Sequence, residues 1–263
     1  MGELAFVGLG LSDERGLSER ARELLASSDV VFAEEYTAVA PDGTLERLAR
    51  FLGKPVRKLD RPLLESEGPI LEALATHARV ALVVVGDPFA ATTHVALRLA
   101  AERSGHRWTY YPNASILTAA AGFLGLIQYR FGRTVSLPLP AERFAPVSPL
   151  EHIAENRERD LHTLVLLDLR PEEGRFLTAD AALAMIRERD PTGRFVADDH
   201  RVGVVARIGR DDAQAWVGPF ARLRAIDFGP PLHALVVLAP TLHFEEEAAV
   251  ARFATGDASR SAP

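Results

Sequence analysis

Cysteine is absent from this chain of 263 residues, and lysine is rare. Its absence excludes disulfides, thiolate metal sites, iron–sulfur ligation and cysteine nucleophiles. No apolar run reaches the roughly 18–20 residues that a membrane-spanning helix needs. The histidines are scattered, with none of the spacings typical of metal ligands. We therefore expect neither a bound metal nor a membrane segment.

Lysine is also rare, since only Lys54 and Lys58 accompany the many arginines. The formal net charge is −6, whereas proteins that coat nucleic acid usually carry a basic excess. We expect no direct nucleic-acid partner and interpret the arginine preference as genome composition. Near the start of the chain, Glu3 stands where a secretory signal would carry a basic residue, so we expect a cytoplasmic protein.

Short apolar runs alternate with longer segments of helical spacing, a pattern typical of βαβ units and a largely parallel sheet. The predicted fold class is therefore α/β. In the first half, strands are expected at residues 4–8, 30–33, 56–59, 80–85 and 108–111, and helices at 18–26, 44–52, 69–77 and 94–104. In the second half, strands are expected at 163–169, 201–208, 213–217 and 232–238, and helices at 115–127, 149–159 and 178–189.

Prolines 138, 140, 146 and 149 crowd a stretch with few periodic positions, which indicates a connection between two domains. We predict an N-terminal α/β domain over residues 1–112 and a connecting helix with a proline-rich linker over 113–147. A C-terminal α/β domain follows over 148–250. Residues 256–263 lack apolar anchors, and the tail over 251–263 is expected to fray.

Glycines gather where the first strand ends, in the sequence Val7-Gly8-Leu9-Gly10-Leu11. Glycine at the carboxyl end of a strand lets a ligand approach the backbone closely. Ser12 and Asp13 stand where a dinucleotide fingerprint would have its third glycine. Alone, the segment fits a tight turn before a helix capped by Ser18 as well as it fits a ligand site.

Two more strand ends carry small or polar residues, at Gly86-Asp87-Pro88 and at 113–116. Asp87 fits a turn former or a ligand contact, and His94 could line a crevice or cap the next helix. Asn113 or Ser115 fits a helix N-cap. If the three strands are neighbours in one parallel sheet, their ends converge at the edge where such sheets bind ligands.

The motifs together resemble the diphthine synthase family. The resemblance extends over nearly the whole chain up to about residue 247. The segments that carry it are Phe-Val-Gly-Leu-Gly-Leu-Ser-Asp-Glu-Arg at 6–15, Ala-Glu-Glu-Tyr-Thr at 33–37, Gly-Asp-Pro-Phe-Ala-Ala-Thr-Thr-His at 86–94, Asn-Ala-Ser-Ile at 113–116, Tyr-Arg-Phe-Gly at 129–132, Val-Ala-Arg-Ile-Gly at 205–209 and Asp-Phe-Gly-Pro-Pro-Leu-His at 227–233.

This family belongs to the tetrapyrrole-methylase group, and the resemblance implies two α/β domains with a cofactor cleft between them and a homodimer. The implied cofactor is S-adenosyl-L-methionine. The implied reaction, a step of diphthamide biosynthesis, methylates the amino group of a 3-amino-3-carboxypropyl chain on a histidine. The protein partner is translation elongation factor 2, which carries that histidine.

The resemblance also implies which residues contact the cofactor, in two groups. They are Leu11, Asp87, Ala90, Ser115 and Ile116 in the first domain, and Leu167, Ala206 and His233 in the second. Leu166 and Arg207 are the alternatives to Leu167 and Ala206. Because an attacking amine must be neutral, Asp87 and His233 are also candidate proton acceptors. We interpret His162, which precedes a predicted strand, as structural.

The chain departs from the family pattern at Phe89, at Tyr111-Pro112 and at Leu232, where fine substrate selection could differ. An alternative function is methylation of a corrin or porphyrin precursor. Those enzymes typically begin with Gly-x-Gly-Pro-Gly-Asp, whereas this chain has Ser12-Asp13 without the Pro-Gly. A second alternative is a homologue that binds S-adenosylmethionine without transferring its methyl group.

Overall fold

The structure, a computed structural model, describes residues 2–34, 36, 38–140 and 146–255. Glu35 and Thr37 of the quoted motif, and the tail from residue 256 onward, lie outside the described residues. The chain divides into two compact units. The first comprises Met1–Ile116 with Pro171–Glu173, and the second comprises Leu117–Arg170 with Gly174–Pro263.

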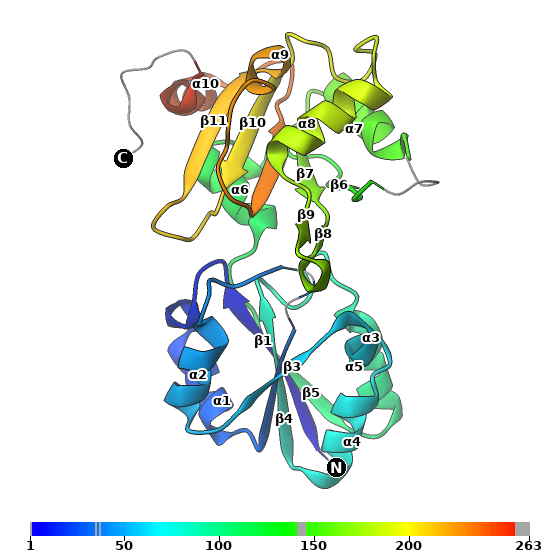
Figure 1. Cartoon of the computed structure of the whole chain (residues 1–263), viewed down its shortest axis with the longest axis vertical. Helices are drawn as coiled ribbons and strands as arrows, with labels where there is room; N and C mark the ends of the chain where they lie inside the picture. Colours follow the sequence, from blue (N-terminus) through cyan, green and yellow to red (C-terminus); the bar gives the residue numbers. More distant parts are fainter. Residues whose placement is uncertain (1, 35, 37, 141–145, 256–263) are drawn as a thin grey trace. The chain divides into compact units, whose positions relative to one another are not determined.

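The first unit is built on a five-stranded sheet of order β3-β2-β4-β1-β5, in which every pair is parallel. Its strands are β1 (Glu3–Gly10), β2 (Val30–Glu34), β3 (Val56–Leu59), β4 (Arg79–Val85) and β5 (Arg107–Tyr111). Its helices are α1 (Glu19–Ser27), α2 (Thr44–Leu52), α3 (Arg61–Glu65), α4 (Gly68–Thr76) and α5 (His94–Arg103). Helices α1 and α2 cover one face, and α3, α4 and α5 cover the other (Figure 1).

Alternation along β1 explains why both faces of this sheet are buried. Ala5 and Val7 pack in the core beneath α1 and α2, whereas Leu4 and Phe6 pack in the core beneath α3 to α5. All four side chains are fully buried. A parallel sheet covered on both faces leaves its strand ends as the place where polar groups can reach a ligand.

Strand β1 lies between β4 and β5, with Val7 opposite Val83 on one side and Tyr111 on the other. The carboxyl ends of these three strands are therefore adjacent. This confirms the predicted convergence of the glycine-rich and polar segments that follow them. The predicted α/β class is confirmed as well.

The second unit contains a mixed five-stranded sheet of order β11-β10-β12-β7-β6 and a short β8-β9 hairpin. Its strands are β6 (Val135–Leu137), β7 (Thr163–Leu167), β8 (Leu169–Arg170), β9 (Arg175–Phe176), β10 (Arg201–Ala206), β11 (Gln214–Pro219) and β12 (His233–Val237). Its helices are α6 (Ile116–Leu124), α7 (Ser148–Glu158), α8 (Ala179–Arg189), α9 (Phe220–Leu223) and α10 (Phe244–Val250). Helices α7, α8 and α9 supply side chains to the main core on one face of this sheet.

Two expectations about this half of the chain are corrected. Residues 135–137, expected to be linker, form β6, which pairs in parallel with β7. The tail does not fray at its start, because Ala251–Phe253 form a 3-10 helix and the Thr255 amide donates to the Val217 carbonyl at 2.9 Å. The short elements α3, α9 and α10 were also not expected, since four to seven residues give too little periodicity to detect.

A buried charge network organises the core of the second unit. Glu246 is fully buried and accepts hydrogen bonds from the Ile127 and His243 amides, from the His162 ring and from Arg130. Burial opposes its negative charge, but the two amides and His162 outweigh that effect and lower the pKa of Glu246 to about 2. His162 also accepts from the Ala239 amide, which agrees with its structural interpretation.

Candidate functional site

The ends of β1 and β4 are tied together by their glycines. Gly10 and Gly86 exchange two backbone hydrogen bonds, of 3.1 and 2.8 Å, in an antiparallel bridge that follows the parallel pairing. Both have φ near +80°, a left-handed conformation that glycine adopts without steric cost. Leu11 and Asp87 therefore leave the sheet from adjacent positions.

Asp87 connects the loop after β4 to β5 and the segment that follows it. Its Oδ1 accepts from the Phe89 amide at 3.0 Å, and its Oδ2 accepts from the Tyr110 hydroxyl at 2.5 Å and the Asn113 amide at 3.2 Å. An ionised carboxylate can accept about four hydrogen bonds. Asp87 is thus the turn former that the sequence suggested and keeps capacity for one further donor.

The Asn113 side chain joins segments that are distant along the chain. Its Nδ2 donates to the carbonyls of Gly8 at 2.9 Å and Gly16 at 3.0 Å. A Cβ on Gly8 would come within 2.7 Å of both the Asn113 Cβ and the Gly86 carbonyl oxygen. Gly8 is therefore required for close packing at this edge.

Aromatic side chains surround the Asp87 loop on the side of α5. The Phe89 ring lies 4.9 Å from Phe6 and 5.0 Å from Tyr110, centroid to centroid. Burial raises the pKa of Tyr110 to about 12, and its hydrogen bond to Asp87 adds to the shift. The departure at Phe89 thus has a structural reason, because an aromatic ring fits between those of Phe6 and Tyr110.

The five predicted cofactor residues of the first unit all lie at this sheet edge. Leu11 follows β1, Asp87 and Ala90 follow β4, and Ser115 and Ile116 follow β5 at the start of α6. The Ala90 amide donates to the Asp87 carbonyl at 3.2 Å. All five are partly buried, so each retains surface that a ligand could contact.

The three predicted cofactor residues of the second unit also share one sheet edge. Ala206 ends β10 and lies directly opposite His233, which begins β12. Leu167 ends β7, one residue beyond Leu166, which lies opposite Ala234 of β12. The sheet register therefore brings Leu167, Ala206 and His233 together.

His233 is fixed in one chemical form by its neighbours. Its Nδ1 accepts a hydrogen bond from the amide of Ala179, the first residue of α8, at 3.1 Å. In a neutral ring the proton is then on Nε2, which is buried and has no hydrogen-bond partner among the described residues. Burial lowers the pKa of His233, and the Arg207 guanidinium adds to this effect. His233 is therefore a neutral hydrogen-bond donor.

Arg207, which the sequence offered only as an alternative contact, holds the loop that leads to His233. Its guanidinium donates to the carbonyls of Phe228 and Pro230 and to the Asp212 carboxylate, and its side chain is 6% exposed. Its amide donates to the Leu232 carbonyl at 2.8 Å. The motif containing Arg207 was visible in the sequence, but this supporting role depends on neighbours distant along the chain.

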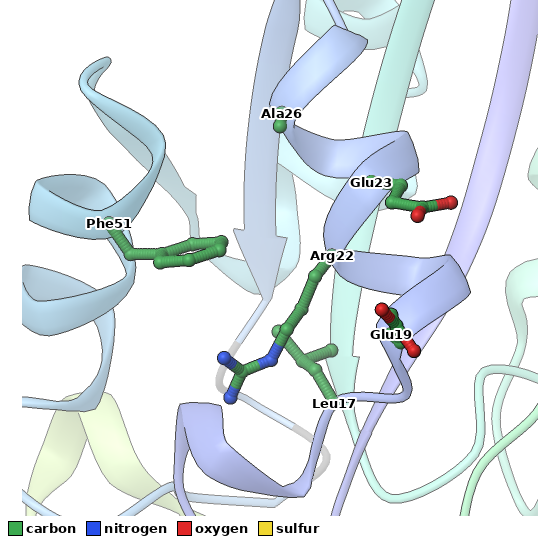
Figure 2. Close-up of a pocket in the computed structure, with 6 residues that line it drawn as sticks. All are labelled: Leu17, Glu19, Arg22, Glu23, Ala26 and Phe51. Atoms are coloured by element: carbon green, nitrogen blue, oxygen red, sulfur yellow. The ribbon is translucent and has the colours of Figure 1, made fainter.

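A shallow hollow of about 540 Å³ lies elsewhere on the first unit, between α1 and α2 (Figure 2). Arg22 extends across it, with its guanidinium 5.2 Å from the centre of the Phe51 ring. Leu17, Glu19, Glu23 and Ala26 complete its lining. No predicted cofactor residue is among them, so the hollow is separate from the candidate site.

None of the helices in the described part of the chain has both the length and the apolar character needed to span a bilayer. Over the same residues, no three histidine or acidic side chains are grouped so that they could hold a metal ion.

Comparison with known proteins places this geometry in a family context. Residues 3–224 match the sequence model of the Tetrapyrrole (Corrin/Porphyrin) Methylases. The chain is 38% identical over 251 residues to a diphthine synthase of Methanoregula boonei, covering 95% of this chain and 98% of the relative. It is 37% identical over 274 residues to a diphthine methyl ester synthase of Aspergillus fumigatus, covering 97% and 95%. A crystal structure of a diphthine synthase is similar with a TM-score of 0.85 and 36% identity, covering 96% of each chain.

Proposed function

Because the chain belongs to the tetrapyrrole methylase family and, within it, to the diphthine synthases, we propose that it is an S-adenosylmethionine-dependent methyltransferase of diphthamide biosynthesis. Its substrate is the amino group of the 3-amino-3-carboxypropyl-histidine intermediate on translation elongation factor 2. The observation that carries the proposal is the gathering of Leu11, Asp87 and Ala90, with Ser115 and Ile116, at one edge of a parallel sheet.

The residues present fit the proposed cofactor. In the first unit, Asp87 has acceptor capacity left for an ammonium or hydroxyl group. In the second unit, Nε2 of His233 is a buried donor with no well-formed hydrogen bond to a described residue, although the nearby Phe228 and Pro230 carbonyls raise the pKa of the ring. A cofactor acceptor would complete its hydrogen bonding. Leu11, Ala90, Ser115 and Ile116, together with Leu167 and Ala206, would supply further contacts. When bound, S-adenosylmethionine supplies an electrophilic methyl group.

The rate of methyl transfer to an amine depends mainly on how the amine is oriented toward the methyl group. Holding the amine in line with the methyl carbon can lower a barrier by roughly 7–11 kcal/mol. The amine must also lose a proton before it attacks. His233 is poorly suited to accept that proton, because the Ala179 amide occupies the lone pair of its Nδ1. Asp87 keeps one acceptor position, which the proposed cofactor contact occupies, so a path to solvent would take the proton while the cofactor is bound.

A transfer assay tests the proposed function. The purified protein is incubated with methyl-labelled S-adenosylmethionine and an elongation factor 2 that carries the unmethylated intermediate, with unmodified factor as the control. Label on the modified factor alone is expected. Absence of transfer to the modified factor, despite cofactor binding, would refute the proposed substrate and favour the non-catalytic alternative.

Mass spectrometry of the same product sharpens the proposal. The relatives are named both diphthine synthase and diphthine methyl ester synthase, at nearly equal identity to this chain. We propose the amine as the acceptor, so the added methyl groups should all be on nitrogen. A mass loss of one methyl group after mild alkaline hydrolysis would reveal an ester instead. We further propose a homodimer in the cytoplasm, to be checked by light scattering and by fractionation.

A further inference from the structure

The loop between β4 and α5 is folded around a single carbonyl group. The Pro88 carbonyl accepts from the Thr92 hydroxyl at 2.5 Å and from Nδ1 of His94 at 2.7 Å. Ala91, between Pro88 and Thr92, has a φ of +58°, which a residue other than glycine adopts only when its surroundings impose it. The side chains of Thr92, near the end of the loop, and His94, the first residue of α5, therefore hold the beginning of the loop.

The His94 ring is buried, with 2% of the residue exposed. Since a carbonyl only accepts, Nδ1 carries a proton and donates it to Pro88. The other ring nitrogen is Nε2. This nitrogen has no hydrogen-bond partner among the described residues. The Oε1 atom of buried Glu34 lies 3.9 Å from it. The ring thus lies between the loop after β4 and the end of β2.

Glu34 is itself held in place at the last position of β2. Its Oε2 accepts from the Tyr36 amide at 3.0 Å, and the Tyr36 hydroxyl lies 3.4 Å from the Thr93 hydroxyl. The segment after β2 and the loop after β4 are therefore connected at two places, once through His94 and once through Thr93. Neither connection involves a residue predicted to contact the cofactor.

We propose that His94 is a positioning residue, which holds the Pro88 carbonyl so that Asp87 and Ala90 face the cofactor. This rests on the proposed function, because it concerns the loop that carries two of the proposed contacts. Asp87 and Ala90 lie on either side of Pro88-Phe89, so a change at the Pro88 carbonyl alters both. His94 itself acts only through the loop.

The test measures binding of S-adenosylmethionine by calorimetry in four full-length variants. His94→Ala removes the donor to Pro88 and should weaken binding about tenfold. His94→Asn can place an amide N–H where Nδ1 was and should remain within about threefold of the unchanged protein. Thr92→Val removes the second donor to Pro88 and should weaken binding about threefold. The values correspond to the net worth of about one hydrogen bond.

His162→Ala is the matched control, because it removes another buried histidine that faces a glutamate, Glu246 at 3.0 Å, in the core of the second unit. It should lower the melting temperature and leave affinity for S-adenosylmethionine unchanged. In the transfer assay, His94→Ala should raise KM for the cofactor and leave kcat unchanged at saturation. If His94 contributed only to folding, His94→Asn and His94→Ala would have the same affinity for S-adenosylmethionine.

The outcomes separate the two proposals. If the unchanged protein does not bind S-adenosylmethionine, the proposed function fails. If it binds and His94→Ala binds equally well, or if His94→Asn is as impaired as His94→Ala, the positioning role is wrong. If His94→Ala does not fold, His94→Asn and Thr92→Val are compared with the unchanged protein. A greater loss of affinity for S-adenosylmethionine in His94→Asn than in Thr92→Val would contradict the proposal.

Discussion

Two buried histidines, one in each unit, use the same ring nitrogen, Nδ1, in opposite hydrogen-bonding roles. His94 donates from Nδ1 to the Pro88 carbonyl. His233 accepts at Nδ1 from the Ala179 amide and keeps a proton on Nε2. In each ring, the backbone group that engages Nδ1 determines whether that nitrogen carries a proton.

The two sheet edges also differ in whether their polar side chains accept or donate hydrogen bonds. The first offers the carboxylate of Asp87, which accepts hydrogen bonds, and the second offers the imidazole of His233, which donates one. Polar residues at the strand ends of the two units therefore have opposite hydrogen-bonding roles, which variants at each edge can test.

The largest expected effect comes from Asp87→Ala in the first unit. It removes the acceptor for the Phe89 and Asn113 amides and for Tyr110, together with the proposed ligand contact. Binding of S-adenosylmethionine should weaken about 100-fold, near 2.7 kcal/mol, as for loss of hydrogen bonds to a charged group. Calorimetric titration measures the affinity.

Asp190→Ala is the control for that change. Asp190 is buried in the second unit and also accepts from three amides, those of Arg194, Phe195 and Val196. Its replacement should reduce stability without changing cofactor affinity. Equal loss of affinity in both variants would mean that Asp87 acts only through folding, and the contrast between the edges would disappear.

A smaller effect is expected from His233→Asn in the second unit. The asparagine carbonyl can still accept from the Ala179 amide, but the donor at Nε2 is lost. Affinity for S-adenosylmethionine should fall about tenfold, the equivalent of roughly 1.4 kcal/mol, with little change in melting temperature. Unchanged affinity in the titration would show that the donor at this edge is not used.

Tyr110→Phe should have a weaker effect again at the first edge. It removes one of the three donors to Asp87 and leaves the ring packed against Phe89. A single hydrogen bond is worth about 1 kcal/mol, so affinity should fall about fivefold. Tyr129→Phe serves as the control because Tyr129 is 96% exposed. A loss in the control as large as that in Tyr110→Phe would contradict the assignment.

The smallest expected effect is on the pH dependence of the free energy of unfolding, to which His233 contributes. Because folding lowers the pKa of His233 below the usual histidine value of 6.5, the unfolded chain binds more protons around and below that pH. The stabilisation is fully present above pH 6.5 and is lost as pH falls through the folded pKa. Urea unfolding at pH 7 and 5 should therefore show a smaller decrease for His233→Asn than for the unchanged protein. An equal decrease would contradict the shift.

Much of the first unit could be predicted from the sequence because its signals are local. Helix α2 occupies the predicted residues 44–52, and the Ser18 hydroxyl accepts from the Ala21 amide at 3.2 Å, as expected of a cap. The turn at Asp87 was visible because glycine and proline flank it. These features depend on neighbours within a few residues.

The partners of the site residues could not be predicted in the same way. Tyr110 appears in the sequence as one aromatic residue of a strand, and nothing local indicates its bond to Asp87, 23 residues earlier. Asn113 has the usual sequence context of an N-cap but donates to Gly8, 105 residues away. Strand β6 has only three residues, too few for a periodic signal, and its pairing with β7 defines it.

By itself, the sequence determined the α/β class, most helices and strands, the family and the positions proposed to contact the cofactor, because these depend on periodicity, turn chemistry and motif order. Only the tertiary structure decided the chemistry of those positions. Whether His94 and His233 donate or accept depends on which backbone group reaches Nδ1, and those groups, Pro88 and Ala179, are brought there by folding. The proton on an imidazole is thus assigned by packing.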